Sequence, residues 1–191
     1  MIKHDPIFIG CVANPRLGEV WVALSERGLT TVEFGVDRRL FEASVRRQLK
    51  CDVEDAPPAA RREIRVATCE IAEYLQGTRR FFEFPIDWAI LVSDFQRAAL
   101  RAVFAIPYGE TRTYGQIASQ IGYPHAPRAV GRANATNPMP LVIPCHRVVG
   151  SDGKLHGYGG AGGLRTKQWL LELEGATWAH DHSAQQYSAS R

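Results

Sequence analysis

The segment LVIPCHRVVG, residues 141–150, places a thiol beside an imidazole at the end of an apolar run. A free cysteine is only a few per cent ionised near neutral pH, and a neighbouring base activates it as a nucleophile. Cys145 and His146 are therefore candidates for a nucleophile and its base. Side chains adjacent in sequence do not always face each other, so a direct hydrogen bond and a water-mediated one are both open. The alternative is a buried structural cysteine beside a hydrogen-bonded histidine.

An imidazole that takes up a proton needs an acceptor that orients the ring and stabilises its charged form. The segment RTKQWLLELEGA, residues 165–176, is typical of an amphipathic helix and carries two carboxylates, Glu172 and Glu174. Both are candidates for the acceptor.

The composition favours a globular protein over a membrane, disulfide-rich or metal-binding one. Of the 191 residues 45% are hydrophobic, and no apolar run reaches the roughly 20 residues of a membrane span. Cys11, Cys51, Cys69 and Cys145 form no CxxC pair and no zinc-ligand spacing with the six histidines. We therefore expect a soluble, cytoplasmic protein without a signal peptide, a disulfide framework, a metal or a cofactor.

The charge is distributed unevenly along the chain. Residues 1–93 carry 13 Lys/Arg and 14 Asp/Glu, a net of −1, whereas residues 94–175 carry 9 and 5, a net of +4. This balance permits nucleic-acid binding without demanding it, and ordinary surface charge is the simpler explanation on charge alone.

The first half of the chain reads as a small α/β unit. Val20, Val22 and Leu24 alternate with other residues before a turn at 26–28, and residues 31–34 form a second short strand, which predicts a β-hairpin. Residues 57–77 predict a helix that begins at two prolines and ends at a glycine. Its core-facing residues should be Ile64, Ala67, Ile71 and Tyr74.

The second half reads as mainly helical. Residues 95–106 predict a helix that Ser93 or Asp94 can cap. Its expected apolar face consists of Phe95, Leu100, Val103 and Phe104.

Two short predicted helices follow, and they form a helix-turn-helix candidate. Thr113 can cap the helix over residues 114–122, and Pro127 suits the first position of the helix that continues over 128–136. The second helix carries Arg128 and Arg132 among small residues, which would let its backbone approach a groove closely. Tight packing against the protein's own core is the alternative. The small residues are Ala129, Gly131, Ala133 and Ala135.

Residues 137–175 resemble, nearly residue for residue, the active-site region of the O6-alkylguanine-DNA alkyltransferases, or methylated-DNA–protein-cysteine methyltransferases. The segments YGETRTYGQIA and RAVGRANATNP, residues 108–118 and 128–138, match that family's DNA-binding segments. The resemblance implies an α/β protein with a ribonuclease-H-like α/β domain at 1–92. A mainly helical DNA-binding and alkyl-transfer domain with a helix-turn-helix follows at 93–177, and a flexible tail at 178–191.

The same resemblance assigns four residues to the chemistry. It implies that Cys145 is the acceptor thiol and that His146 is its base, acting through a water molecule. Glu174, just before Gly175, matches the glutamate that orients the histidine, so Glu172 is expected on the surface. Asn137 matches a buried asparagine that links the recognition helix to the active-site strand.

The resemblance also implies which residues contact the DNA and which contact the alkylated base. Arg128 should enter the base stack in place of the flipped nucleotide, and Tyr114 should help to rotate that nucleotide and donate a hydrogen bond to guanine N3. Ala161 stands where some relatives have a serine that contacts O6, so this contact should come from a backbone N–H of the 159–163 loop. The DNA-binding set is Arg128, Tyr114, Ala129, Gly131 and Arg132, and the substrate pocket is Tyr114, Pro140, Val148, Tyr158 and Ala161.

The function implied is repair by direct transfer of an alkyl group from O6-alkylguanine in double-stranded DNA, with O4-alkylthymine as a second substrate. The product is a thioether on the protein, so each molecule, expected to be a monomer, would act once. The family's alkyltransferase-like branch binds damage without reacting, but it lacks the cysteine that this chain has. A cysteine hydrolase would need an oxyanion hole, which no motif indicates. Related transcriptional regulators carry an additional cysteine-rich N-terminal domain, and the N-terminal part of this chain has too few cysteines for that expectation.

Overall fold

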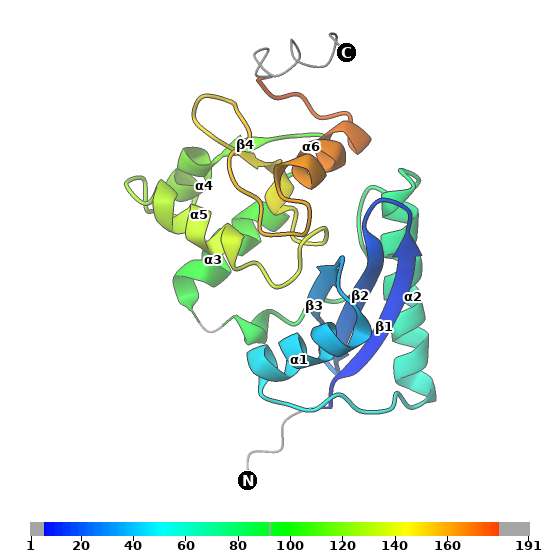
Figure 1. The fold of residues 1–191 in the computed structure, drawn as a ribbon. Helices are drawn as coiled ribbons and strands as arrows, with labels where there is room; N and C mark the ends of the chain where they lie inside the picture. Colours follow the sequence, from blue (N-terminus) through cyan, green and yellow to red (C-terminus); the bar gives the residue numbers. More distant parts are fainter. Residues whose placement is uncertain (1–5, 92, 180–191) are drawn as a thin grey trace.

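The computed structural model describes residues 6–91 and 93–179, and Figure 1 shows their arrangement. This part of the chain is a mixed α/β protein with six α-helices and two small sheets, in agreement with the predicted α/β class. The elements are β1 (Phe8–Asn14), β2 (Gly18–Ser25), β3 (Gly28–Phe34), α1 (Arg38–Leu49), α2 (Pro58–Leu75), α3 (Asp94–Phe104), β4 (Arg112–Thr113), α4 (Tyr114–Gln120), α5 (Pro127–Ala135), β5 (Val148–Val149) and α6 (Leu164–Leu173), with short 3-10 helices at Trp88–Ile90 and Cys145–Arg147.

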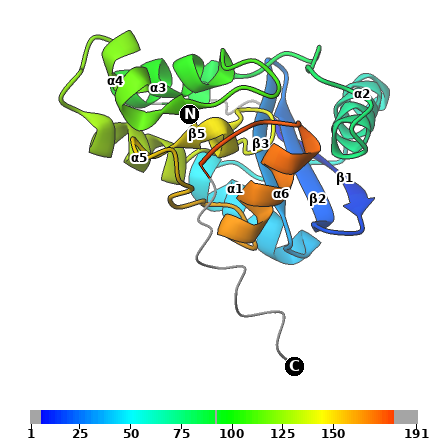
Figure 2. The ribbon, with the colours of Figure 1, turned by 90° about the horizontal axis from the view of Figure 1, so that it is seen from above.

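The predicted hairpin is confirmed as β2 and β3, and β1 completes an antiparallel sheet in the order β1-β2-β3. Figures 1 and 2 show α2 on one side of this sheet and α1 on the other. Alternate residues of β2 therefore enter two apolar clusters, with Val20 and Val22 in that of α2 and Trp21 and Ala23 in that of α1. Strand β1 was not predicted, because Gly10 and Cys11 interrupt its apolar pattern.

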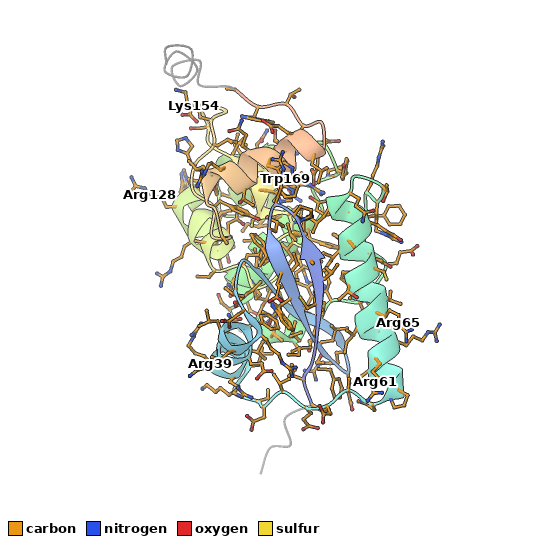
Figure 3. All side chains as sticks on the ribbon, turned by 45° about the vertical axis from the view of Figure 1, so that its right-hand side comes forward. Arg39, Arg61, Arg65, Arg128, Lys154 and Trp169 are labelled. Carbon is orange, nitrogen blue, oxygen red and sulfur yellow. The ribbon has the colours of Figure 1, made fainter. Side chains whose placement is uncertain are left out.

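Helix α2 forms where the sequence predicted it. Pro57 is its N-cap and Pro58 its first residue, a position that needs no backbone N–H donor. Ala67, Ile71 and Tyr74 are completely buried against the sheet and the second half of the chain. Arginines labelled in Figure 3, such as Arg61 and Arg65, occupy the opposite, solvated side.

Helix α3 begins after Ser93, whose side chain accepts a hydrogen bond from the backbone N–H of Gln96. Leu100 and Val103 are buried as predicted, but the prediction for Phe104 is wrong, because its side chain is 40% exposed. Phe104 is the last residue of the helix, and its ring lies edge-on against Trp88, with 5.7 Å between the ring centroids.

Helices α4 and α5 contact each other and α3. The predicted Thr113 cap is confirmed, with Gln116 completing a reciprocal capping box, and α5 begins at the predicted Pro127. The parallel pair β4–β5 joins the start of α4 to the segment that follows Cys145.

The larger of the two apolar clusters contains buried residues of both halves of the chain. The two halves are also joined by a backbone hydrogen bond of 2.8 Å from the Val32 N–H to the Pro138 carbonyl. The expected boundary between two domains near residue 92 thus stays a prediction. Most of the expected tail, from residue 180 on, lies outside the described residues. No helix in the described part of the chain is both long and apolar enough to span a bilayer.

Candidate active site

The apolar run before Cys145 is a tight turn that leads into a 3-10 helix, and the short strand β5 begins after that helix, at Val148. The Ile143 N–H donates to the Met139 carbonyl across the turn, and Leu141 has a φ of 75°, unfavourable for a side chain with a Cβ. Asn137 fixes the turn, because its Nδ2 donates to the Ile143 carbonyl at 2.8 Å and its Oδ1 accepts from the Met139 N–H at 3.0 Å. This places Cys145 at a defined point after the turn that follows α5.

His146 is completely buried, and its Nε2 lies 2.9 Å from Oε1 of Glu174. Glu174 follows the last residue of α6 and is 6% exposed, whereas Glu172 is exposed and accepts a hydrogen bond from Gln168. The structure therefore pairs His146 with Glu174, as the family resemblance implied.

The Glu174 carboxylate is surrounded by donors. Arg147 donates through Nε to Oε2 and through Nη2 to Oε1, both at 2.8 Å, and the Gly109 N–H donates to Oε2 at 3.2 Å. The Tyr74 hydroxyl donates to Oε1 at 2.6 Å. Burial alone would raise the pKa of Glu174, but the hydrogen bonds and charges of His146 and Arg147 outweigh it and hold that pKa well below its ordinary value. The carboxylate therefore stays ionised.

An ionised carboxylate beside Nε2 requires a proton on that nitrogen, because two acceptors would repel each other. Burial lowers the pKa of His146 against the opposing effect of Glu174, so the ring is neutral at physiological pH. Nδ1 is therefore the basic nitrogen, and it has no hydrogen-bond partner among the described residues. His146 is thus a poised proton acceptor.

Cys145 is 5% exposed, and burial raises the pKa of its thiol. A hydrogen bond with the Asn137 side chain and the charge of Lys167 act in the opposite direction. Because the thiol is protonated and the imidazole is neutral, sulfur can attack only as its proton is transferred to a base.

Two cavities meet at the thiol. The first, which we call the sheet-side cavity, has a volume of about 240 Å³ and lies between Cys145, Pro140, Ala161 and the β3 residues Val32 and Phe34. The second, the tyrosine cavity, has a volume of about 290 Å³ and is lined mainly by apolar groups. Its lining includes Tyr114, Gly131, Asn134, Tyr158 and Cys145. The predicted pocket residues are thus divided between two adjoining spaces, and Val148 lines neither of them.

Lys167 is a buried cation beside this site. Its Nζ donates to the carbonyls of Val148, His156 and Gly157, at 2.6, 3.0 and 3.3 Å. Burial lowers the pKa of Lys167 to about 8. Lys167 therefore connects α6 to β5 and to the loop that carries Tyr158.

We expect Lys167→Met to lower the midpoint of thermal unfolding clearly, because three carbonyls lose their donor and each unmet buried group costs about 1–3 kcal/mol. Differential scanning calorimetry measures the change. Arg165→Met, an exposed substitution on the same helix, is the control and should change the midpoint by less than about 1 °C. Equal midpoints for the two variants would contradict the role given to Lys167.

The loop after Tyr158 packs closely against both halves of the chain. A Cβ on Gly159 would lie 2.9 Å from the Ala135 carbonyl oxygen at the end of α5, and a Cβ on Gly160 would lie 2.5 Å from the Phe34 ring. The glycines therefore allow the loop to close over the sheet-side cavity between α5 and β3.

The predicted DNA-binding residues lie together on α5 and at the start of α4. Arg128, Ala129 and Arg132 are exposed, and Figure 3 shows Arg128 pointing away from the body of the molecule. Tyr114 and Arg128 border a broad surface hollow. In this structure the Tyr114 hydroxyl donates to the His156 carbonyl at 3.1 Å.

No group of three or more potential metal ligands was found among the described residues. None of the four cysteines forms a disulfide, and Cys11 and Cys69 are exposed whereas Cys51 is half-buried.

Comparison with known proteins identifies the family. The family model of the 6-O-methylguanine DNA methyltransferase DNA-binding domain matches residues 94–176. A methylated-DNA–protein-cysteine methyltransferase from Methanosarcina acetivorans is 39% identical over 160 residues, which cover 84% of this chain and 94% of that protein. The chain belongs to the methylated-DNA–protein-cysteine methyltransferase family.

Other members of the methyltransferase family are also similar to this chain. A protein of that name from Mycolicibacterium paratuberculosis is 60% identical over 105 residues, which cover 55% of this chain and 61% of that protein. The crystal structure of Mycobacterium tuberculosis OGT in complex with DNA matches with a TM-score of 0.71 and 36% identity, covering 88% of this chain and 92% of that chain.

Sequence reasoning had not assigned several groups of this methyltransferase site. Arg147 and Lys167 were given no role, and Tyr74 was expected only as a core residue of α2. Asn134, whose buried amide faces both cavities without a hydrogen-bond partner in the described structure, was read only as part of the recognition helix. A basic residue directly after the Cys-His pair was a usable signal for Arg147, whereas nothing local marks Tyr74.

Proposed function

We propose that this protein repairs DNA by direct, stoichiometric transfer of the alkyl group from O6-alkylguanine to its own Cys145, which inactivates it. The observation that carries the proposal is the buried thiol at the junction of two cavities, next to a neutral imidazole that Glu174 orients. Membership of the methyltransferase family and the DNA complex of the Mycobacterium tuberculosis relative support it.

The reaction is a displacement at the alkyl carbon. The Cys145 sulfur forms a bond to that carbon while the bond from carbon to guanine O6 breaks. His146 accepts the thiol proton at Nδ1, through a water molecule, and then releases it to solvent, while the departing guanine takes up one proton from solvent, so charge and atoms balance. In this proposal Tyr114 exchanges its hydrogen bond to the His156 carbonyl for one to guanine N3. The product is an S-alkyl thioether, which water does not readily hydrolyse.

The substrate base must leave the stack to reach this thiol. We propose that α4 and α5 form the helix-turn-helix and that α5 enters the minor groove, where its small residues allow close approach. Arg128 then fills the space left by the extruded nucleotide, since its planar, permanently charged guanidinium can stack and donate hydrogen bonds.

Arg128→Ala should slow transfer from duplex DNA by about 10- to 100-fold, because unassisted unstacking costs a few kcal/mol. Its reaction with free O6-benzylguanine should stay within about threefold of the unaltered rate, since no base has to be extruded. Single-turnover kinetics on both substrates measures the two losses. Arg132→Ala, on the same exposed helix, is the control for phosphate contacts. Equal losses on both substrates for Arg128→Ala would refute its part in flipping.

The deciding experiment is intact-protein mass spectrometry after incubation with an oligonucleotide that contains O6-methylguanine. We expect a gain of one methyl group per protein molecule, located at Cys145 by peptide mapping, and no second round of repair. Binding without a mass gain would indicate a non-reacting damage sensor, and repeated turnover of an ester or peptide would indicate a hydrolase.

The finer points of organisation are also proposals. A ribonuclease-H-like arrangement of residues 1–92 is supported by the three antiparallel strands and by a parallel bridge from Ile7 to Val53 beside β1. We further propose the division into 1–92 and 93–177, and a monomer that acts in the cytoplasm on double-stranded DNA carrying alkylated guanine.

A further inference from the structure

We propose that Tyr74, on helix α2 of the N-terminal half, is a positioning residue of the alkyl-transfer site that sets the basicity of His146 through Glu174. The proposal rests on the function proposed above. It assigns a chemical task to the N-terminal half, where the sequence analysis placed none of the site residues.

The contact that carries the inference is a buried three-way arrangement. The Tyr74 hydroxyl donates to Oε1 of Glu174 at 2.6 Å and lies 3.2 Å from Nε2 of His146. His146 Nε2 lies 2.9 Å from the same Oε1. The side chains of Tyr74 and His146 are completely buried, so water does not compete for these hydrogen bonds.

The direction of each hydrogen bond follows from the charges. Glu174 is ionised and can only accept, so the phenol proton points to Oε1. The lone pairs of the phenol oxygen then face Nε2–H of His146, which is shared between Tyr74 and Glu174. Burial, reinforced by the charge of Glu174, raises the pKa of Tyr74 well above its ordinary value, so the hydroxyl remains a donor over the whole working pH range.

The hydroxyl therefore has two effects on His146. It occupies Oε1 with a short hydrogen bond and so makes the carboxylate a weaker acceptor for the imidazole. It also holds the ring so that Nδ1 remains the free nitrogen. Removal of the hydroxyl should strengthen the pull of Glu174 on Nε2–H, which favours imidazolium and raises the pKa of His146.

The other charged and titratable groups around this contact come from several elements. Arg147 shares Glu174, and Lys167 of α6 and the Cys145 thiol lie near His146. The Tyr108 ring packs edge-on against Tyr74, with centroids 6.2 Å apart, and its hydroxyl donates to the Leu173 carbonyl. The Coulombic effect of Tyr158 also raises the pKa of the Tyr74 phenol. Of the phenols at this site, only that of Tyr74 donates to the Glu174 carboxylate within the described structure.

The test compares Tyr74→Phe, which keeps the ring, with Tyr108→Phe, which removes a neighbouring hydroxyl from a backbone carbonyl. The rate of Cys145 alkylation by free O6-benzylguanine is measured from about pH 5 to about pH 9, because this substrate needs no base extrusion. For Tyr74→Phe the acidic limb of the pH–rate profile should move to higher pH. The alkylation rate should fall by about tenfold at pH values below that limb and by less than about threefold near pH 8.5. Tyr108→Phe should retain the original limb.

A merely structural role would lower the rate of Tyr74→Phe by one factor at every pH, and this result would overturn the proposal. Thermal unfolding of both variants checks that each is folded. Should Tyr74→Phe fail to fold, nitrogen-15 NMR of the unaltered protein still decides. At neutral pH His146 should carry its proton on Nε2 with Nδ1 unprotonated, and the reverse tautomer would refute the arrangement.

A nitrogen-15 NMR titration, which measures the pKa of His146, separates this inference from the proposed function. If the unaltered protein takes no alkyl group from DNA or from O6-benzylguanine, the proposed function fails. The pKa of His146 can still be compared between the unaltered protein and Tyr74→Phe. A higher pKa in Tyr74→Phe would then uphold the coupling alone, and an unchanged or lower pKa would refute it.

Discussion

Cys145→Ala should abolish alkyl transfer completely while leaving the affinity for DNA within about twofold, because the thiol is the atom that forms the new bond and lies beneath the DNA-binding face. No mass gain should appear after long incubation with an O6-methylguanine oligonucleotide. The cost in stability should be small, about 1 kcal/mol, since one buried sulfur is removed and no ion pair is broken. Intact-mass spectrometry and a gel-shift titration measure the two properties side by side.

Cys69→Ala is the matched control, because this cysteine is exposed on α2 and remote in sequence from the active-site turn. It should take up one methyl group per molecule at the unaltered rate. A full mass gain in Cys145→Ala would instead show that another nucleophile accepts the group, and the assignment of the acceptor would be wrong.

Glu174→Gln should be the most damaging substitution that leaves Cys145 in place. A carboxamide has one acceptor oxygen where the site presents five donated hydrogen bonds, and its NH2 group would face the guanidinium of Arg147. We expect transfer to slow by at least about 100-fold, because the imidazolium loses its counterion. Breaking a buried ion pair should also cost about 3–5 kcal/mol of folding free energy. Single-turnover kinetics and urea unfolding measure the two losses.

The control, Glu172→Gln, should change both properties little, because Glu172 is exposed and contacts Gln168. If Glu172→Gln slowed transfer more than Glu174→Gln, Glu172 would be the partner of His146.

Because the folded-state pKa of Glu174 is depressed, its stabilising contribution is present above the unfolded-state pKa of about 4.3 and is lost as the pH falls through the lower folded-state pKa. The gap in unfolding free energy between the unaltered protein and Glu174→Gln should therefore narrow below about pH 4.

The local elements of this fold were predictable because their signals are local. Thr113 and Gln116 three residues apart mark a capping box, and Pro127 marks a helix start, so both helix beginnings could be placed from the sequence. The exposure of Phe104 could not be predicted, since helical spacing does not show where the core ends. The turn at 139–143 was missed because an apolar run of this length does not distinguish a strand from a buried turn.

The candidate site was predictable only where residues are close in sequence or match a family position. Cys145, His146 and Asn137 come together through one short turn. Tyr74 could not be placed there, because it reaches Glu174 across 100 positions of sequence and its periodicity marks only a buried helix face. The split of the pocket residues between two cavities likewise depends on how β3 meets α5, which no local pattern encodes.

The wall that β3 contributes to the sheet-side cavity has a practical consequence for protein engineering. Phe34, the last residue of β3, and Val36, two residues further on, lie more than a hundred residues from Cys145 in the chain, yet they border the same space as the reactive sulfur. Mutant libraries intended to widen the range of transferable groups should therefore randomise these two positions together with Pro140 and Ala161. A library confined to the C-terminal half would leave one wall of that space unsampled.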